Sequence, residues 1–174
     1  YGGNENLEAV EFFKHLNSIF KKKEPGAVLI AEESAAWPGV TTPVEEDGLG
    51  FDFKWNTGWT DDLLGYMSLD PIFRGYHHGE LTFSMIYAYS EDYMLTFSHD
   101  DIVNGKESRI RKMPGRTAQQ EANLRAAYAY MVAHPGKKLL FMGQEFAQEE
   151  DWKAEKELEW DLLEKEDHLE MQQF

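Results

Sequence analysis

The sequence contains no cysteine, which excludes both a disulfide framework and a metal site built on thiolates. No apolar run approaches the roughly 18 residues that span a membrane, and no secretory signal pattern opens the chain. Basic residues are scarce: 17 Lys and Arg stand against 32 Asp and Glu, giving a net charge of −15. This balance argues against nucleic acid and membranes as partners. The lack of cysteine fits a cytoplasmic protein.

What the sequence does contain is enough apolar material for one core, since 42% of its 174 residues are hydrophobic and 14% are aromatic. We find no internal repeat and no low-complexity tract, so we predict a single domain over residues 1–174. The charge is uneven, because residues 149–174 hold 11 acidic and 3 basic residues. We expect this segment to form a solvated charged surface with four apolar side chains packed inward: Trp152, Leu158, Trp160 and Leu163.

Apolar residues recur at helical spacing in some segments and form short continuous runs in others. Helices are predicted over residues 7–23, over 81–89 and around Leu124 to Met131, the last ending at Pro135-Gly136. Helices that alternate with short apolar strands favour a parallel sheet covered by helices, which is the α/β class. The predicted strands cover residues 27–31, 51–55, 94–97 and 139–142.

Polar residues directly follow three of the predicted strands. These are Glu32-Glu33, His99-Asp100-Asp101 and Gln144-Glu145. Because the carboxyl ends of parallel strands lie on one side of a sheet, we expect the three groups on a common rim, where β/α barrels place their catalytic residues. A single carboxylate at such a place is usually a helix cap or a loop residue. Three together favour a functional site.

Other residues have an ordinary structural interpretation beside a functional one. His99-Asp100 taken alone fits a loop turn equally well, and Trp55 is expected to pack in the core. The adjacent pair His77-His78 has no other ligand types nearby in the sequence, so a structural role is favoured over a metal site.

A resemblance to a known family rests on long strings that occur in this order: AEESAAWPGVTTPV, GLGFDFKWNTGW, DPIFRGYHHGELTF, FSHDDIVNGK, KMPG and HPGKKLLFMGQEFAQ. With them the chain resembles the 1,4-α-glucan branching enzymes of the α-amylase superfamily, from YGGNENLEAVEF to HLEMQQF. The resemblance implies the C-terminal half, about four β/α units, of a TIM (β/α)8 barrel. It also implies a fragment that runs from the helix after the fourth barrel strand to the opening of the eighth helix.

The family's retaining chemistry needs two carboxyl groups about 5–5.5 Å apart, one a nucleophile and the other an acid/base. By resemblance Glu32 is the acid/base, and Asp100 is a third acidic residue that binds hydroxyls of the distorted sugar. His99 donates hydrogen bonds to the same ring. We expect no cofactor and no metal. The remaining residues expected to bind substrate are Glu33, Trp37, Gln144 and Glu145.

The sequence departs from the family pattern at several positions. Asp101 and Asn104 stand where the family usually has a glutamate and a later histidine, and Gly79 replaces a common acidic residue. These changes bear on subsites rather than on the reaction. The nucleophilic aspartate of the family lies on the fourth strand, two residues after an arginine, and this chain has no counterpart before Tyr1. We therefore expect the chain alone to be inactive.

The resemblance implies part of the catalytic domain of an enzyme of glycogen biosynthesis. Such an enzyme cleaves an α-1,4 bond in its glucan substrate and transfers the freed chain to a 6-hydroxyl. Two alternatives stay open: a related α-glucan hydrolase of amylase or debranching type, and a non-enzymatic α-glucan-binding half-barrel. Half a barrel leaves the strands at 27–31 and 139–142 as open edges, so we also expect the fragment to self-associate.

Overall fold

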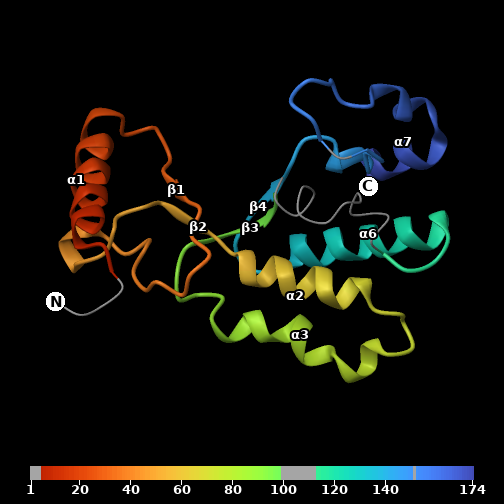
Figure 1. The fold of residues 1–174 in the computed structure, drawn as a ribbon, viewed down its shortest axis with the longest axis horizontal. Coiled ribbons are helices and arrows are strands. Elements are labelled where there is room, and N and C mark those ends of the chain that lie inside the picture. Colours follow the sequence, from red (N-terminus) through yellow and green to blue (C-terminus); the bar gives the residue numbers. More distant parts are fainter. Residues whose placement is uncertain (1–4, 99–112, 151) are drawn as a thin grey trace.

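A computed structural model describes residues 5–98, 113–150 and 152–174 and contains one four-stranded sheet. The strands are β1 (Ile30–Ala31), β2 (Phe53–Trp55), β3 (Tyr93–Phe97) and β4 (Lys137–Leu140). They lie in chain order, and every neighbouring pair is parallel (Figure 1). The predicted α/β class is therefore confirmed. β1 and β4 are the two edges of the sheet, as the sequence analysis expected.

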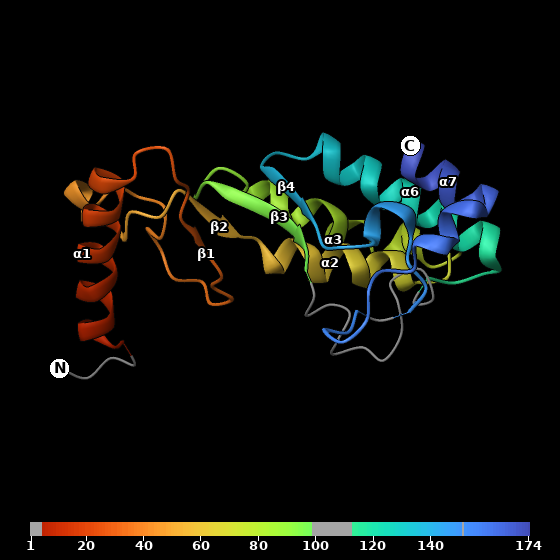
Figure 2. The same cartoon turned by 90° about the horizontal axis from the view of Figure 1, so that it is seen from above.

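Helices connect the strands and gather mainly at one end of the molecule. The α-helices are α1 (Leu7–Lys23), α2 (Thr57–Ser68), α3 (His78–Phe83), α6 (Thr117–Ala133) and α7 (Glu166–Gln173). α2, α3 and α6 lie beside β3 and β4, whereas α1 stands apart beyond β1 (Figure 2). Short 3-10 helices occur at Val44–Glu46, Arg74–Tyr76, Ser84–Ile86, Gln144–Phe146 and Trp160–Glu164.

The core lies where β3 meets α2 and α6. Leu95 and Phe97 of β3 are fully buried. The Phe97 ring packs between Trp59 of α2 and Tyr128 of α6, with ring centroids 5.6 and 5.8 Å away. Alternate residues of β3 thus face the helices, which fixes that face of the sheet as the covered one.

Several predicted elements differ from the observed ones. The apolar run at 27–31 forms only a two-residue strand, and β4 begins two residues earlier than expected. The helix predicted at 81–89 is α3 followed by a 3-10 turn, which begins at Ser84 and ends at Ile86. α2 was not predicted at all. Trp59 rather than the half-buried Trp55 is the core tryptophan.

α1 packs on the loop between β1 and β2, not on the core. Its one buried residue is Asn17, whose side chain donates to the Leu49 carbonyl at 2.8 Å. The Phe13 and Phe51 rings lie 5.6 Å apart, and Lys21 pairs with Asp52 at 2.9 Å. Most of the apolar face of this helix therefore stays exposed.

The loop itself is held in a tight shape by backbone hydrogen bonds. The N–H of Gly48 donates to the Pro43 carbonyl at 3.0 Å, and that of Gly50 donates to the Thr42 carbonyl at 3.0 Å. A Cβ at position 48 would lie 2.1 Å from the Thr42 oxygen, so only glycine fits this backbone.

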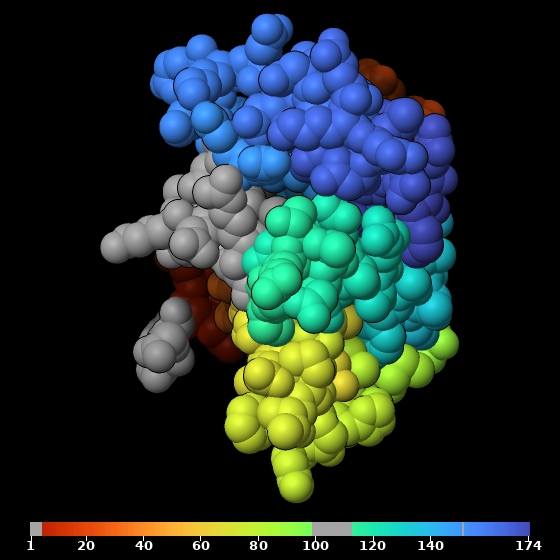
Figure 3. All heavy atoms as spheres, turned by 90° about the vertical axis from the view of Figure 1, so that its right-hand side faces the viewer, coloured from red at the N-terminus to blue at the C-terminus, as the bar shows by residue number. Residues whose placement is uncertain are grey.

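The acidic C-terminal segment folds back over α6, and Figure 3 shows it on that face. Leu162 and Met171 of this segment are buried, as is Phe146, and the His168 ring is hydrogen-bonded to the Phe146 carbonyl at 2.8 Å. Trp160, expected to pack inward, is 52% exposed and lies against the Phe146 ring. Within the described residues, no helix is both long enough and apolar enough to cross a membrane.

Candidate active site

The carboxyl ends of the four strands lie on one side of the sheet, because all four are parallel. Glu32 follows β1 directly, Asn56 follows β2, and Gln144 lies just beyond β4. β1 and β4 are opposite edges, so β2 and β3 lie between the strand before Glu32 and the strand before Gln144. His99 and Asp100, expected after β3, fall outside the described residues.

Glu32 and Glu33 directly follow the end of β1 at Ala31, and the register of that strand indicates a face for each. Ile30 pairs with Phe53 and Ala31 with Lys54, while Lys54 in turn pairs with Tyr93 on the helix-covered face. Side chains along a strand point alternately to its two faces. If this alternation is extended past Ala31, it predicts Glu33 on the covered face and Glu32 on the other face. Glu33 does line a cleft beside Lys54, whereas Glu32 is exposed and is not one of the lining residues.

A buried lysine holds the backbone that follows the two glutamates. Lys54 is 5% exposed, and its Nζ donates to the carbonyl oxygens of Ala35 at 3.0 Å and Trp37 at 3.2 Å. The Glu33 carboxylate accepts from the Ala35 N–H at 2.5 Å. Hydrogen bonds to charged groups are among the stronger ones in proteins, so Lys54 and Glu33 together fix the path of this loop.

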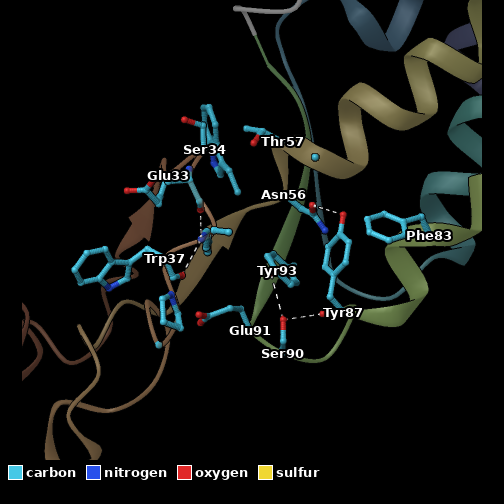
Figure 4. Close-up of a pocket in the computed structure, with 17 residues that line it drawn as sticks. Glu33, Ser34, Trp37, Asn56, Thr57, Phe83, Tyr87, Ser90, Glu91 and Tyr93 are labelled. Carbon is cyan, nitrogen blue, oxygen red and sulfur yellow. Dashed lines mark hydrogen bonds between the residues drawn. The ribbon is translucent and has the colours of Figure 1, made fainter. Parts of the chain in front are cut away.

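The cleft has a volume of about 490 Å³ and lies between this loop, the start of α2 and the approach to β3 (Figure 4). Its aromatic lining residues come from three separate parts of the chain. They are Trp37, Trp55, Phe83, Tyr87 and Tyr93. Its polar lining includes Glu33, Lys54, Asn56, Thr57, Ser90 and Glu91.

Asn56 links the cleft to the start of α2. Its Oδ1 accepts from the Trp59 N–H at 3.0 Å as the N-cap of the helix, and also from the Tyr87 hydroxyl at 3.3 Å. Its Nδ2 is buried and has no hydrogen-bond partner among the described residues. Burial, with a smaller contribution from the Asp62 charge, raises the pKa of Tyr87 to about 12. Tyr87 is therefore a neutral hydroxyl over the physiological range.

Glu91 closes the far end of the same loop. Its carboxylate accepts from the backbone N–H groups of Val40 at 3.0 Å and Thr41 at 2.8 Å, and from the Thr41 hydroxyl at 2.5 Å. Partial burial raises the pKa of Glu91, but the hydrogen bonds from Thr41, Val40 and Gly39 outweigh it and hold the pKa below its ordinary value. Glu91 is thus an ionised anchor for the loop.

Gln144 and Glu145 begin a 3-10 turn after β4. Gly143, with φ at +84°, makes the sharp change of direction before it. Gln144 is buried, and its carbonyl accepts from the Tyr128 hydroxyl of α6 at 2.8 Å. The helix core therefore supports this part of the rim more directly than it supports Glu32.

The histidine pair lies away from this site. The His77 Nδ1 lies 2.6 Å from the Glu80 carboxylate, within one helical turn. Among the described residues, no three His, Asp or Glu side chains form a group that could hold a metal ion.

Comparison with known proteins identifies the family. A protein of Rhizobium etli named 1,4-alpha-glucan branching enzyme GlgB 2 is 58% identical over all 174 residues of the chain. Proteins of Nitratidesulfovibrio vulgaris and Clostridium perfringens named 1,4-alpha-glucan branching enzyme GlgB are 57% and 53% identical over 93% and 100% of the chain. Over its full length, the chain is similar to one part of these branching enzymes. No family model matches it.

The chain spans only about a quarter of each of these branching enzymes, covering 24%, 25% and 27% of their lengths. It thus represents one part of a branching enzyme. The predicted resemblance is confirmed by these identities.

Sequence reasoning missed two residues that organise this part of the branching-enzyme chain. Lys54 interrupts the apolar alternation of Phe53 and Trp55 with a charge, and that charge is buried. Asn56 precedes a helix that was itself overlooked. A lysine within a short apolar strand and an asparagine directly after it were the available signals.

Proposed function

We propose that this chain carries the acid/base of a branching enzyme, and that Glu32 is that residue. The observation that supports this most is the register of β1: extended by one residue past Ala31, its alternation predicts Glu32 on the face opposite the helices, at the carboxyl end of a parallel strand. β/α barrels place catalytic groups at that end. An exposed carboxyl there is free to meet a glucan.

In this proposal the reaction follows the retaining route. A nucleophilic carboxylate attacks the anomeric carbon, while the Glu32 carboxyl protonates the departing glycosidic oxygen. The Glu32 carboxylate then takes the proton from the 6-hydroxyl of an acceptor chain, which attacks the covalent intermediate and forms the α-1,6 branch. The nucleophile belongs to a part of the enzyme outside this chain.

The four parallel strands are, in the same proposal, the C-terminal half of a TIM barrel. The chain order β1-β2-β3-β4 is the order that successive barrel strands have, and in the described part of the chain the helices that pack on β3 lie on one face of the sheet. The uncovered face then turns toward the barrel interior. We assign the remaining expected contacts to the glucan: His99 and Asp100 to the reacting sugar, and Glu33, Trp37, Gln144 and Glu145 to other parts of the chain.

The full-length parent tests the assignment. Glu32→Gln and Asp100→Asn are each expected to lower branching of amylose by several orders of magnitude with little change in thermal stability, whereas Glu33→Gln lowers it far less. Iodine staining and the count of α-1,6 linkages measure branching, and the release of reducing ends measures hydrolysis. A larger loss in Glu33→Gln than in Glu32→Gln would reverse the assignment. Hydrolysis without new branches would favour the amylase-like alternative.

The isolated chain is proposed to be inactive, because it lacks the nucleophile that the two-step route requires. The same iodine assay with the purified chain is expected to show no turnover. Turnover that disappears in Glu32→Gln would contradict this, whereas turnover unaffected by Glu32→Gln would point to a contaminating enzyme.

We also propose that the isolated chain self-associates as a two-fold dimer. Both sheet edges carry exposed apolar side chains, namely Val28 and Ile30 near β1 and Leu140 and Met142 near β4. Unpaired edges with such side chains favour pairing with another chain, and a second copy presents the same two edges. Light scattering over a concentration series is expected to detect the dimer. A monomer at every concentration, with no binding of a hydrophobic dye, would exclude it.

A further inference from the structure

The short 3-10 turn after β4 is bounded by two residues in the left-handed conformation. Gly143 precedes it with φ at +84°, and Ala147 follows it with φ at +56°. Glycine adopts this conformation readily, whereas a Cβ makes it unfavourable. A residue such as Ala147 keeps it only where the surroundings hold the backbone, and such residues cluster at functional sites. The turn therefore needs support from the rest of the fold.

Two buried side chains from two different helices supply that support. From α6, the Tyr128 hydroxyl donates to the Gln144 carbonyl at 2.8 Å. From α7, the His168 Nδ1 lies 2.8 Å from the Phe146 carbonyl, and it must donate there because a carbonyl oxygen only accepts. The turn is thus held at its first and at its last residue.

The second ring nitrogen of His168 faces the chain that leaves the turn. Its Nε2 lies 3.4 Å from the Glu149 carboxylate, which also pairs with Lys165 at 3.5 Å. Lys165 is the N-cap residue of α7. The start of α7 and the buried His168 ring therefore contact the same carboxylate, and His168 connects the turn to the segment that follows it.

The residues of the turn divide between the core and the rim of the sheet. Phe146 is fully buried, whereas Glu145 is only half-buried. Gln144 begins the turn just beyond β4, at the end of the strand where the proposed function assigns Gln144 and Glu145 to the glucan. Side chains on a turn are placed accurately only where supporting hydrogen bonds fix its backbone.

We propose that Tyr128 and His168 are positioning residues for glucan binding, because they hold the turn that carries Gln144 and Glu145. Both are buried and act through the turn rather than on the glucan. The inference rests on the proposed function, which assigns Gln144 and Glu145 to the substrate. Loss of either hydrogen bond lets the strained turn relax. The enzyme then binds its glucan less tightly, while the groups that cleave the bond keep their places.

Two tyrosines of α6 provide a variant and its matched control. Tyr128→Phe removes one hydroxyl and leaves the ring, which packs on Phe97 with centroids 5.8 Å apart. Tyr130→Phe also removes a hydroxyl that donates to a backbone carbonyl, but this carbonyl belongs to Leu81 in α3. Only the first of these variants frees the turn.

Two variants of His168 separate the hydrogen bond from the volume of the ring. His168→Leu removes both ring nitrogens and keeps an apolar side chain in the buried place. His168→Asn retains an N–H donor at the position of Nδ1, so it can still bind the Phe146 carbonyl. Rescue by asparagine therefore distinguishes a role in holding the turn from a role in packing.

The first test is the kinetics of amylose branching by the full-length parent. Tyr128→Phe and His168→Leu are expected to raise KM about fivefold with kcat within about twofold of the parent, because binding lost equally from substrate and transition state appears in KM. His168→Asn should restore most of the loss, and Tyr130→Phe should leave KM unchanged. Tyr128→Phe and His168→Leu combined should raise KM by less than the product of their separate effects, since both act on one turn. Melting curves verify folding, and Tyr128→Phe alone carries the test if His168→Leu does not fold.

Hydrogen exchange in the full-length parent tests the turn without reference to activity. The N–H groups of Ala147 and Gln148 donate to the Gln144 and Gly143 carbonyls at 3.2 and 2.9 Å, so their exchange reports whether the turn is closed. Exchange of both should be about tenfold faster in Tyr128→Phe and unchanged in Tyr130→Phe.

In a parent that branches amylose, an unchanged KM in Tyr128→Phe would overturn the inference and leave the proposed function intact. An equal rise of KM in Tyr130→Phe would overturn it too, because the effect would then belong to α6 as a whole. A parent that neither branches nor cleaves glucan, but binds maltoheptaose more weakly in Tyr128→Phe than in Tyr130→Phe, would support the inference and refute the proposed function.

Discussion

The centre and the edge of the sheet are held by different forces. β3 places Leu95 and Phe97 at 0% exposure between α2 and α6. β1 has two residues, of which Ile30 is 40% exposed, and the preceding Val28 is 56% exposed. Around β1 two polar contacts position the chain: the Leu29 N–H donates to Asp52 at 2.8 Å, and Lys54 holds the loop that follows. Burial stabilises the centre, and hydrogen bonds position the edge.

The difference between β3 and β1 indicates where a substitution can alter function without unfolding the protein. Regions with few buried apolar contacts open at lower free energy than the core does. The proposed acid/base lies in such a region. Its geometry therefore depends on a few named hydrogen bonds, while the fold depends on β3, α2 and α6.

The largest expected effect comes from breaking the centre. Phe97→Ala removes a fully buried ring that contacts Trp59 and Tyr128, and should lower the free energy of unfolding by about 3–5 kcal/mol. Ile30→Ala at the edge should cost less than about 1 kcal/mol. Urea unfolding of both variants measures the contrast. Equal losses would mean that β1 belongs to the same cooperative core.

The second-largest expected effect is a local loss of stability in the loop after β1, with the core left folded. Lys54→Met removes two charge-assisted hydrogen bonds and should cost about 1.5–3 kcal/mol locally, because the Ala35 and Trp37 carbonyls lose their partner. Limited proteolysis should then cut within residues 33–39 before the rest of the chain unfolds. Lys138 is a matched control, since its Nζ also donates to two carbonyls, those of His134 and Gly136, but the residue is exposed. Lys138→Met should leave the loop uncut.

Acid should affect the two regions in opposite directions, and this is the smallest effect. The lowered pKa of Glu91 gives the loop a stabilising contribution that is complete above pH 4.5 and is lost as pH falls through the folded-state pKa. Burial, with the Asp167 charge beside it, raises the pKa of Glu121 in α6. Its contribution is complete below pH 4.5 and is lost as pH rises through that higher pKa.

Melting curves of two variants measure this difference. At pH 7, Glu91→Gln should lower Tm and Glu121→Gln should raise it by a few degrees or less. At pH 4 both changes should shrink. A drop in Tm for Glu121→Gln at pH 7 would show that its ionised form is needed in the folded protein.

Sequence patterns predicted the parallel sheet because short apolar segments alternate along the chain with helical patterns that break at Pro and Gly. They failed for α2, although Trp59, Leu63 and Met67 recur every four residues, because Gly58 and Gly65 weaken the helical signal. The run at 27–31 was apolar enough for a long strand. Its partner strand β2 begins only at Phe53, so most residues of the run have no neighbouring strand to pair with.

The candidate site was only partly predictable. A pair of glutamates after an apolar run marks the end of a strand, but adjacent residues give no sign of which one faces the helices. That choice depends on the pairing of Ala31 with Lys54, which is a property of the folded sheet. The cleft was not predictable, since its lining comes from three segments that only the fold brings together.

Gly48 has a consequence for anyone who surveys variants of this protein. Every side chain at this position would collide with the Thr42 carbonyl, so a comprehensive substitution library should find it among the least tolerant sites of the loop. The loop follows the proposed acid/base in the sequence. Loss of activity in Gly48 variants is therefore easily mistaken for evidence of a catalytic role. Gly48 matters because it has no side chain. A substitution there would displace the loop backbone, although no functional group of the protein would be removed.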